Sequence, residues 1–257
     1  MVATIEEYLD RQGHWSERLT AFNIRLTAAQ QAGDRRDQRH CLGNLGYTCL
    51  RRGELEQALY WSEQSLAIDR DWGNQQGEAV ILNNIGDIYR QQGNYEQAQQ
   101  YLEQSLNIRR ELGDRGGEGT TLNNIGLLYW MQGRYEHAQQ YYQQALSISR
   151  EVRHKILEGS TLDNIATIHR VQGEPSKALK YHQQALAISR ELGDRLKEAQ
   201  SCLNIGLAYH DLGDLAQAEE HIALAVEIAE AIEHPALEEW REKLGRLRIA
   251  RHGPEEA

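Results

Sequence analysis

A five-residue motif recurs every 40 residues along most of this 257-residue chain, and the period constrains the fold more than any other feature. The motif has asparagine third, an aliphatic residue fourth, and glycine or alanine fifth. A second glycine follows seven residues later, and an alanine comes five residues after that. The five copies begin at Leu42, Leu82, Leu122, Leu162 and Cys202. A period of this length is typical of repeat proteins, in which each unit packs on its neighbours.

Each repeat is predicted to form two antiparallel helices, helix A followed by helix B. Leu82 and Tyr89 share one face of a helix A. Gly93 is expected to end that helix, because glycine readily takes the left-handed conformation of a helix terminus. The short side chains of Gly86 and Ala98 are expected to lie where the two helices cross closely.

A residue that can cap a helix stands at the start of each repeat. Asp114 follows Gly113, and its carboxylate can accept hydrogen bonds from the free N–H groups of the next helix. The equivalent positions hold Asp34, Asn74 and Asp194, with His154 and His234 as weaker substitutes.

This spacing of Leu-Gly, Tyr and Ala resembles the tetratricopeptide repeat (TPR) family. The family's common unit has about 34 residues, so the longer units here imply longer helices. Kinesin light chains and the Leu-Gly-Asn-repeat polarity adaptors share that feature, and the chain resembles them. The resemblance implies an all-α fold, a right-handed α-solenoid of antiparallel helix pairs (a TPR superhelix). Full repeats are predicted at 34–73, 74–113, 114–153, 154–193 and 194–233.

The N-terminal segment departs from the repeat. Residues 1–33 are interpreted as a truncated repeat, because Gly13 stands 40 residues before Gly53. The run from Thr4 to Glu7 has the pattern of a capping box and is expected to start a shortened first helix.

The C-terminal segment also breaks the repeat. Residues 234–257 are predicted to form a capping helix and tail, with Pro235 at the start of the helix. Arg246 replaces the small residue of the motif, and further basic residues make the segment polar. A polar terminal helix of this kind can cover the apolar face of the last repeat.

The charge of the chain argues against a polyanionic partner. It carries 28 basic and 38 acidic side chains, a formal net charge of −10. The stretch from Asp194 to Ala257 has 7 basic and 14 acidic residues and so holds −7 of that charge. We therefore expect neither a nucleic acid nor a membrane surface as partner. No membrane-spanning apolar run and no signal peptide are visible.

The three cysteines form no metal-binding pair and no disulfide framework. Cys41 and Cys49 are predicted on one helix, eight residues apart, which is too far along the helix axis for a bridge. This cysteine usage fits a reducing cytoplasm.

Motifs of catalysis are absent from the sequence. It has no P-loop, no dinucleotide-binding turn, no zinc-protease motif and no nucleophile elbow. The run from Gly113 to Gly117 lacks a P-loop lysine and a preceding strand, so it is interpreted as a turn between repeats. The ten histidines show no metal-ligand spacing on one helix. We predict no catalytic residue, no metal and no cofactor.

The motif asparagines are the main candidate binding residues. They are Asn44, Asn84, Asn124, Asn164 and Asn204. Asparagine both donates and accepts hydrogen bonds, so a row of them could pair with the backbone of an extended peptide. The resemblance implies that helix A lines the concave groove, and in the resembling adaptors such a row does grip peptide backbone. The alternative is that these side chains bond neighbouring helices and fix the stacking of repeats.

Residues that vary between repeats surround this row and are candidates for partner specificity. Those assigned to the groove are Asn83, Asp87, Arg90, Asn123, Trp130, Met131, Asp163 and Arg170. Trp130 and Met131 stand among polar neighbours and could anchor an apolar side chain of the partner. Packing between helices is the alternative role for these two residues.

The sequence therefore indicates a non-enzymatic adaptor or sensor module of the bacterial cytoplasm, whose concave groove binds a protein or peptide. The run from Leu9 to Leu19 is similar to the entry into the repeats of STAND-type signalling ATPases, where the repeats form a sensor. One alternative is the excised sensor half of such an ATPase. A structural assembly scaffold that acts through its outer faces or ends is the other alternative.

Overall fold

The computed structural model describes residues 15–252, and this range contains twelve α-helices and no strand. The chain divides into two compact units, Met1–Tyr141 (unit 1) and Tyr142–Ala257 (unit 2). The division falls inside helix α8, Tyr135–Glu151. The expected capping box at Thr4 and the glycine at position 13 lie outside the described residues, as does the first part of the STAND-like run.

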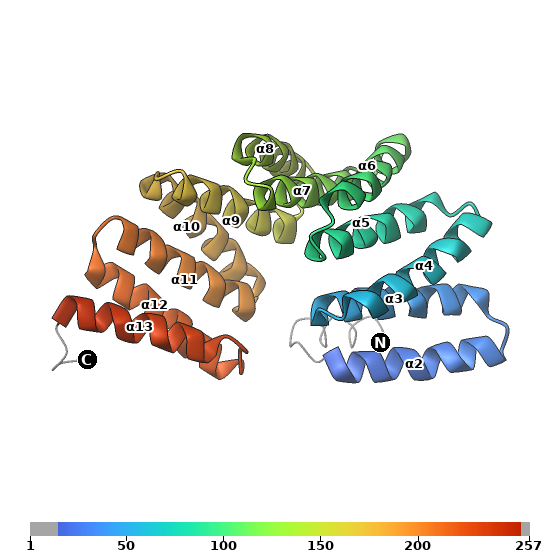
Figure 1. Ribbon diagram of the computed structural model, residues 1–257, viewed down its shortest axis with the longest axis horizontal. Coiled ribbons are helices and arrows are strands. Elements are labelled where there is room, and N and C mark those ends of the chain that lie inside the picture. Colours follow the sequence, from blue (N-terminus) through green and yellow to red (C-terminus); the bar gives the residue numbers. More distant parts are fainter. Residues whose placement is uncertain (1–14, 253–257) are drawn as a thin grey trace. The chain divides into compact units, whose positions relative to one another are not determined.

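The helices of unit 1 alternate in direction, because turns of only a few residues join them (Figure 1). Each helix from α2 to α6 packs against the next, and α3 also contacts α5, as α5 contacts α7. Before α8 they are α2 (Trp15–Gln31), α3 (Arg35–Arg52), α4 (Leu55–Asp71), α5 (Gln75–Gln91), α6 (Tyr95–Leu112) and α7 (Arg115–Met131).

Unit 2 repeats this arrangement after the second part of α8. Its helices pack consecutively from α9 to α13. They are α9 (Lys155–Val171), α10 (Pro175–Leu192), α11 (Arg195–Asp211), α12 (Leu215–Ala231) and α13 (Leu237–His252). The predicted fold class, an all-α solenoid of antiparallel helix pairs, is confirmed. The repeat boundaries remain a prediction, in which α3, α5, α7, α9 and α11 are the helices A and α4, α6, α8, α10 and α12 the helices B.

Glycines end the helices as the sequence predicts. Gly93 after α5 has a φ of 77° and Gly113 after α6 a φ of 67°, both in the left-handed region. Two repeats lack the second of these glycines, and Arg153 (φ 57°) and Glu233 (φ 53°) take the same conformation there. A side chain in this region costs free energy that glycine does not.

The predicted capping residues are confirmed. The side chains of Asp34, Asn74, Asp114 and Asp194 each accept a hydrogen bond from a backbone N–H in the first turn of the helix that follows. His154 does the same through Nδ1, which accepts from the N–H of Leu157 at 3.2 Å.

The small residues of the motif lie where two helices cross, as predicted. A Cβ atom on Gly86 would stand 2.6 Å from Leu102 Cγ of α6, and a Cβ on Gly206 would stand 2.5 Å from Ile222 Cγ1 of α12. Larger side chains at these positions would overpack the crossing, at a cost of about 1–3 kcal/mol.

The C-terminal helix α13 covers the apolar face of α12. Trp240, which is 3% exposed, packs into the same core cluster as Ile222 and Ile228. Arg248 and Arg251 both pair with Glu219 of α12, at 2.9 and 2.7 Å.

The helix begins at Leu237, two residues later than the sequence suggested from Pro235. The cause is a turn that precedes it. His234 accepts hydrogen bonds from the N–H groups of Ala236 (to Nδ1) and Leu237 (to the carbonyl oxygen), so the proline lies within the turn.

Candidate peptide-binding groove

The motif asparagines are all half-buried on the helices A, and their hydrogen bonds differ between repeats. Asn44 of α3 accepts from Arg18 Nη2 at 2.8 Å and donates to the carbonyl of His40 at 2.9 Å. Asn204 of α11 accepts from Gln200 one turn earlier at 3.2 Å. These contacts leave part of each amide's hydrogen-bonding capacity unused.

The hydrogen bond of Asn124 favours the alternative that the motif asparagines fix the stacking of repeats. Its Nδ2 donates to Oδ1 of Asn83 at 3.1 Å, which joins α7 to α5 across neighbouring repeats. Asn83 is itself buried. The side chain of Asn84, by contrast, takes part in no hydrogen bond within the described residues. The assignment of this row to a peptide-binding groove stays a prediction. Asn84 is the member whose side chain is least used in hydrogen bonds within the described residues.

Three of the other groove candidates of unit 1 form one cluster. Asp87 Oδ1 pairs with Arg90, and Arg90 Nη1 lies 2.8 Å from Met131 Sδ. Met131 is 38% exposed, which suits a contact residue. The indole Nε1 of Trp130 is buried and has no acceptor among the described residues. Asn123, the remaining candidate of this unit, is half-buried on α7.

The candidates of unit 2 are tied into networks. Asp163 of α9 accepts from His182 Nδ1 of α10 at 2.8 Å and from Ser201 Oγ of α11 at 3.2 Å. His182 is 1% exposed, so Asp163 joins three helices at their interior. Arg170 pairs with Asp211 at 3.2 Å. Asn164, like the other motif asparagines, is half-buried.

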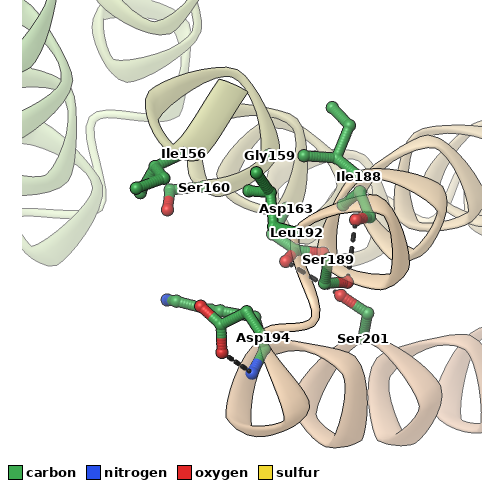
Figure 2. A pocket seen from close by; sticks show the side chains of 11 residues that line it. Ile156, Gly159, Ser160, Asp163, Ile188, Ser189, Leu192, Asp194 and Ser201 are labelled. Atoms are coloured by element: carbon green, nitrogen blue, oxygen red, sulfur yellow. Dashed lines mark hydrogen bonds between the residues drawn. The ribbon is translucent and has the colours of Figure 1, made fainter. Parts of the chain in front are cut away.

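A pocket opens between α9, α10 and α11 beside Asp163. It is small and partly open to solvent. Figure 2 shows Asp163 between Ile156 and Ser160 on one side and Ser189 and Ser201 on the other. Its lining is completed by Gly159, Ala185, Ile188, Leu192, Asp194 and Lys197. The pocket combines aliphatic walls with hydroxyl and carboxylate groups.

At two junctions of unit 1 the equivalent place is filled by an ion pair. We call the meeting of α3, α4 and α5 the α4 junction, that of α5, α6 and α7 the α6 junction, and that of α9, α10 and α11 the α10 junction. Arg39 Nε pairs with buried Asp69 at 2.8 Å at the α4 junction. Arg109 Nη1 pairs with Asp114 at 2.9 Å at the α6 junction. At the α10 junction Ser189 stands where Arg109 stands, and Lys197 stands where Gly117 stands.

A ladder of ion pairs along the junctions was missed by the sequence analysis. Each pair joins an arginine near the end of a helix B to a glutamate in the next helix A. The pairs are Arg70–Glu78 (2.8 Å), Arg110–Glu118 (2.9 Å), Arg150–Glu158 (3.0 Å) and Arg190–Glu198 (3.0 Å). Both residue types recur every 40 residues, so the signal was present in the sequence. Partly exposed pairs of this kind contribute about 0–1 kcal/mol each.

The three cysteines are buried and form no disulfide. Burial raises the pKa of the Cys49 and Cys202 thiols to about 11. They are therefore protonated near neutral pH and are poor nucleophiles. No cluster of three or more histidine, cysteine or acidic side chains among the described residues could hold a metal ion. No described helix is both long and apolar enough to cross a membrane.

Comparison with known proteins identifies the repeat. Two family models, each described as Tetratricopeptide repeat, match residues 77–151 and 157–231 and residues 39–64. No curated protein sequence matches the chain.

Solved structures with the same fold have low sequence identity to the chain. A Rap protein complexed with Competence and Sporulation Factor matches with a TM-score of 0.73 and 14% identity, over 95% of this chain and 73% of that one. BtubC (BKLC) from P. vanneervenii matches with a TM-score of 0.69 and 19% identity, over 85% and 92%. A STAND protein with a tetratricopeptide repeat sensor from Pyrococcus horikoshii matches with a TM-score of 0.66 and 19% identity, over 83% of this chain and 33% of that one. At these identities the likeness establishes the fold alone.

Proposed function

The chain belongs to the tetratricopeptide repeat family, and from that premise we propose that it is a non-enzymatic adaptor or sensor that binds a peptide or protein segment along the helices A. The observation that carries the proposal is the row of half-buried asparagines, one at the same position of every helix A. A Rap protein of similar fold was solved in complex with Competence and Sporulation Factor, which supports a small protein or peptide as ligand.

The chemistry of the row suits the backbone of an extended peptide. Each asparagine offers a carbonyl acceptor and two amide donors, and backbone binding needs both. Asn84 has its full capacity free of other hydrogen bonds within the described residues, and Asn44 and Asn204 retain part of theirs. The varied neighbours of the row, such as Asp87 and Met131, would then select the partner's side chains.

The proposal places the adaptor in a bacterial cytoplasm, without a nucleic acid or membrane partner. Three buried cysteines that form no disulfide suit a reducing compartment. The net charge of −10 opposes binding to polyanions. The chain spans a third of the STAND protein that it resembles, so the sensor half of a STAND-type ATPase is one setting in which such a module would act.

A scaffold role is the second candidate, and a recurring apolar edge favours it. The last residues of four successive helices B, or the residues just after them, are exposed and apolar. They are Trp72, Leu112, Val152 and Leu192. A surface of this kind, repeated at each junction, could hold an assembly partner outside the groove.

A displayed random peptide library selected on the full chain supplies a defined ligand for the test. The dissociation constant of one selected peptide is then measured with the wild type and with Asn84, Asn124 and Asn164 together changed to alanine. Each lost hydrogen bond weakens the complex by about 0.5–1.5 kcal/mol, so the triple variant should bind about tenfold to a thousandfold more weakly.

The matched control is Asn107→Ala on the exposed face of α6, which should leave binding unchanged. Thermal melts of all variants separate a binding role from a stacking role. A triple variant that binds at full strength, or that loses its cooperative melt, would assign the asparagines to stacking and turn attention to the apolar edge.

A further inference from the structure

A stripe of five partly exposed residues runs along each helix A, with the motif asparagine at its centre. The members are spaced at i, i+4, i+8, i+11 and i+15, which places them on one face of an α-helix. On α3 the two end residues are exposed and the three middle ones are half-buried. We call this set the α3 stripe, and it consists of Arg36, His40, Asn44, Tyr47 and Arg51.

The α3 stripe differs from its counterparts in charge. It carries two arginines and no acidic residue. The same positions on α5, α7, α9 and α11, which follow at intervals of 40 residues, hold no arginine or lysine and two aspartates, Asp87 and Asp211. Among the five stripes, the arginines are therefore confined to α3.

The part of the chain around the α3 stripe is basic as a whole. Residues 15–52, which form α2, α3 and the turn between them, contain seven arginines and three acidic residues, a net charge of +4. All other residues together carry −14, because the whole chain has a net charge of −10. A local excess of positive charge of this kind attracts anionic groups and speeds their association.

The two arginines of the α3 stripe form no ion pair within the described residues. Arg36 is exposed, and no carboxylate in this range pairs with it. Arg51 is also exposed, and its guanidinium carbon lies 5.8 Å from the centre of the Trp15 ring. Their neighbours Arg35 and Arg39, by contrast, pair with aspartates of α4. The stripe thus presents two guanidinium groups that can pair with carboxylates of a partner.

A third guanidinium lies against the middle of the stripe. Arg18 of α2 stands where the later repeats have an alanine, as at Ala58. It is 7% exposed, and its Nη2 donates to Asn44 Oδ1 at 2.8 Å. Its guanidinium carbon also lies 5.6 Å from the centre of the Tyr47 ring. A buried charge is screened less by salt than an exposed one, so Arg18 adds to the positive potential at Asn44.

Arg36 and Arg51 stand on opposite sides of Asn44 along α3. They are eight and seven residues away from it, which corresponds to about 12 and about 10 Å along the helix axis. In an extended peptide, successive side chains point in opposite directions. A segment whose backbone crosses α3 at Asn44 therefore directs one side chain towards Arg36 and the next towards Arg51. Two adjacent acidic residues would give each arginine a carboxylate partner.

We propose that the α3 stripe binds two adjacent acidic residues, aspartate or glutamate, of the segment that this chain recognises. The inference rests on the proposed function, because the motif asparagines bind the backbone of the same segment. It names the chemical class of the partner, an acidic peptide segment, and the helix that its carboxylates meet. A nucleic acid fits less well, because its phosphates would continue over stripes without a cation.

The test begins with the displayed random peptide library, selected on the full chain. Peptides selected on the wild type should contain adjacent acidic residues more often than the unselected library does. Selection on the double variant Arg36→Gln, Arg51→Gln should lose this enrichment. A library that yields no peptide on the wild type would refute the proposed function and the inference with it, whereas peptides without acidic pairs would refute the inference alone.

The dissociation constant of one selected acidic peptide, measured by fluorescence anisotropy, locates the carboxylates. Each single variant should weaken binding about threefold and the double variant about tenfold, because partly exposed ion pairs contribute little each. A peptide with glutamine in place of both acidic residues should bind the wild type about tenfold more weakly. The double variant should bind the two peptides alike, since the pairs that distinguish them are then gone.

The matched control is Lys180→Gln on the exposed face of α10, a helix B. It removes one positive charge away from the helices A and should leave the binding of the acidic peptide unchanged. Thermal melts of all variants check that each is folded, and exposed arginines replaced by glutamine should leave the melting temperature nearly unchanged.

Three results of these titrations would overturn the inference. The glutamine peptide could bind the wild type as tightly as the acidic peptide, the double variant could bind undiminished, or Lys180→Gln could weaken binding as much as Arg36→Gln does. Displacement of the acidic peptide by a short single-stranded oligonucleotide at physiological salt would also overturn it and assign the stripe to polyanions. Failure of the asparagine row is measured separately, with the triple asparagine variant.

Discussion

The α6 and α10 junctions are built from the same repeat positions, yet one is closed and the other open. At the α6 junction Arg109 lies over Gly117 and pairs with Asp114. At the α10 junction Ser189 and Lys197 stand at these two positions, a small pocket lies beside them, and Asp194 caps α11. The most consequential differences are Arg109 against Ser189 and Gly117 against Lys197, which shows how repeats of one fold can acquire different surfaces.

The largest expected effect on stability comes from adding a side chain at Gly117, because the α6 junction has no space for it. Gly117→Ala should lower the free energy of unfolding by about 2–3 kcal/mol, because the new Cβ overlaps the Arg109 guanidinium and must displace it from Asp114. Lys197→Ala at the open junction should stay within about 0.5 kcal/mol. Urea denaturation measures both, and equal losses would refute the comparison.

Shortening the arginine should turn the closed junction into an open one. Arg109→Ser removes a packed aliphatic stem and the bond to Asp114, so we expect a loss of about 1–2 kcal/mol. Ser189→Ala should change stability by less than about 0.5 kcal/mol, since the hydroxyl bonds only to carbonyls of its own helix. A neutral result for Arg109→Ser in thermal melts would mean that the burial of its charge offsets its contacts.

The residue at the capping position before α13 is a histidine, which makes this cap sensitive to pH. His234 stands where Asp114 and Asp194 stand in their repeats, and its neutral Nδ1 accepts the Ala236 N–H at 3.0 Å. Burial lowers the pKa of His234 below its ordinary value of 6.5. A histidine with a lowered pKa in the folded state stabilises the fold above the unfolded pKa, and this contribution is lost as the pH falls towards the folded pKa.

We therefore expect stability to fall by about 1 kcal/mol, the typical contribution of a cap, between pH 7.5 and pH 5.5. His234→Asn should remove much of that slope, because asparagine caps at either pH. His210→Asn on exposed α11 is the control and should leave the slope as it is. Urea titrations at the two pH values provide the measurement, and a slope unchanged by His234→Asn would rule out the cap as its source.

The smallest expected effect concerns the residue before the cap. Glu233 holds the left-handed conformation that Gly113 and Gly193 hold at the other two junctions. Glu233→Gly should therefore raise the free energy of unfolding by about 0.5–1 kcal/mol, because the strain of a side chain is removed. The reverse change, Gly193→Ala, should lower it by a similar amount in the same assay. If both variants changed the free energy of unfolding in the same direction, the assignment of backbone strain to Glu233 would be wrong.

The features that repeat were predictable from the sequence, because each was seen several times in the same register. The helix ends at glycine, the caps at Asp34, Asn74 and Asp194, and the small residues at the crossings all follow from local chemistry repeated every 40 residues. The start of α13 was placed two residues early, because a turn closed by His234 precedes the helix.

The candidate site was less predictable, because its chemistry depends on pairs of residues from different helices. Sequence reasoning placed Asp163 in the groove but had no means of finding its bond to His182 on α10. It also assigned both Asp87 and Arg90 to the groove, but it did not predict the ion pair between them. The pocket beside Asp163 is lined by residues of three different helices, and no single one of them signals it in the sequence.

The ladder of arginine–glutamate pairs has a consequence for how the chain can change length. Arg70 faces Glu78 in the same way that Arg110 faces Glu118. Deletion of residues 75–114 would join Asn74 to Arg115, and Arg70 would then meet Glu118 in an equivalent position. The ends of the 40-residue repeats are interchangeable in this respect, so whole repeats can be lost or duplicated without a mismatch in these ion pairs. The chain can therefore gain or lose whole repeats. The residues that form a pocket in any one repeat can diverge independently of the number of repeats.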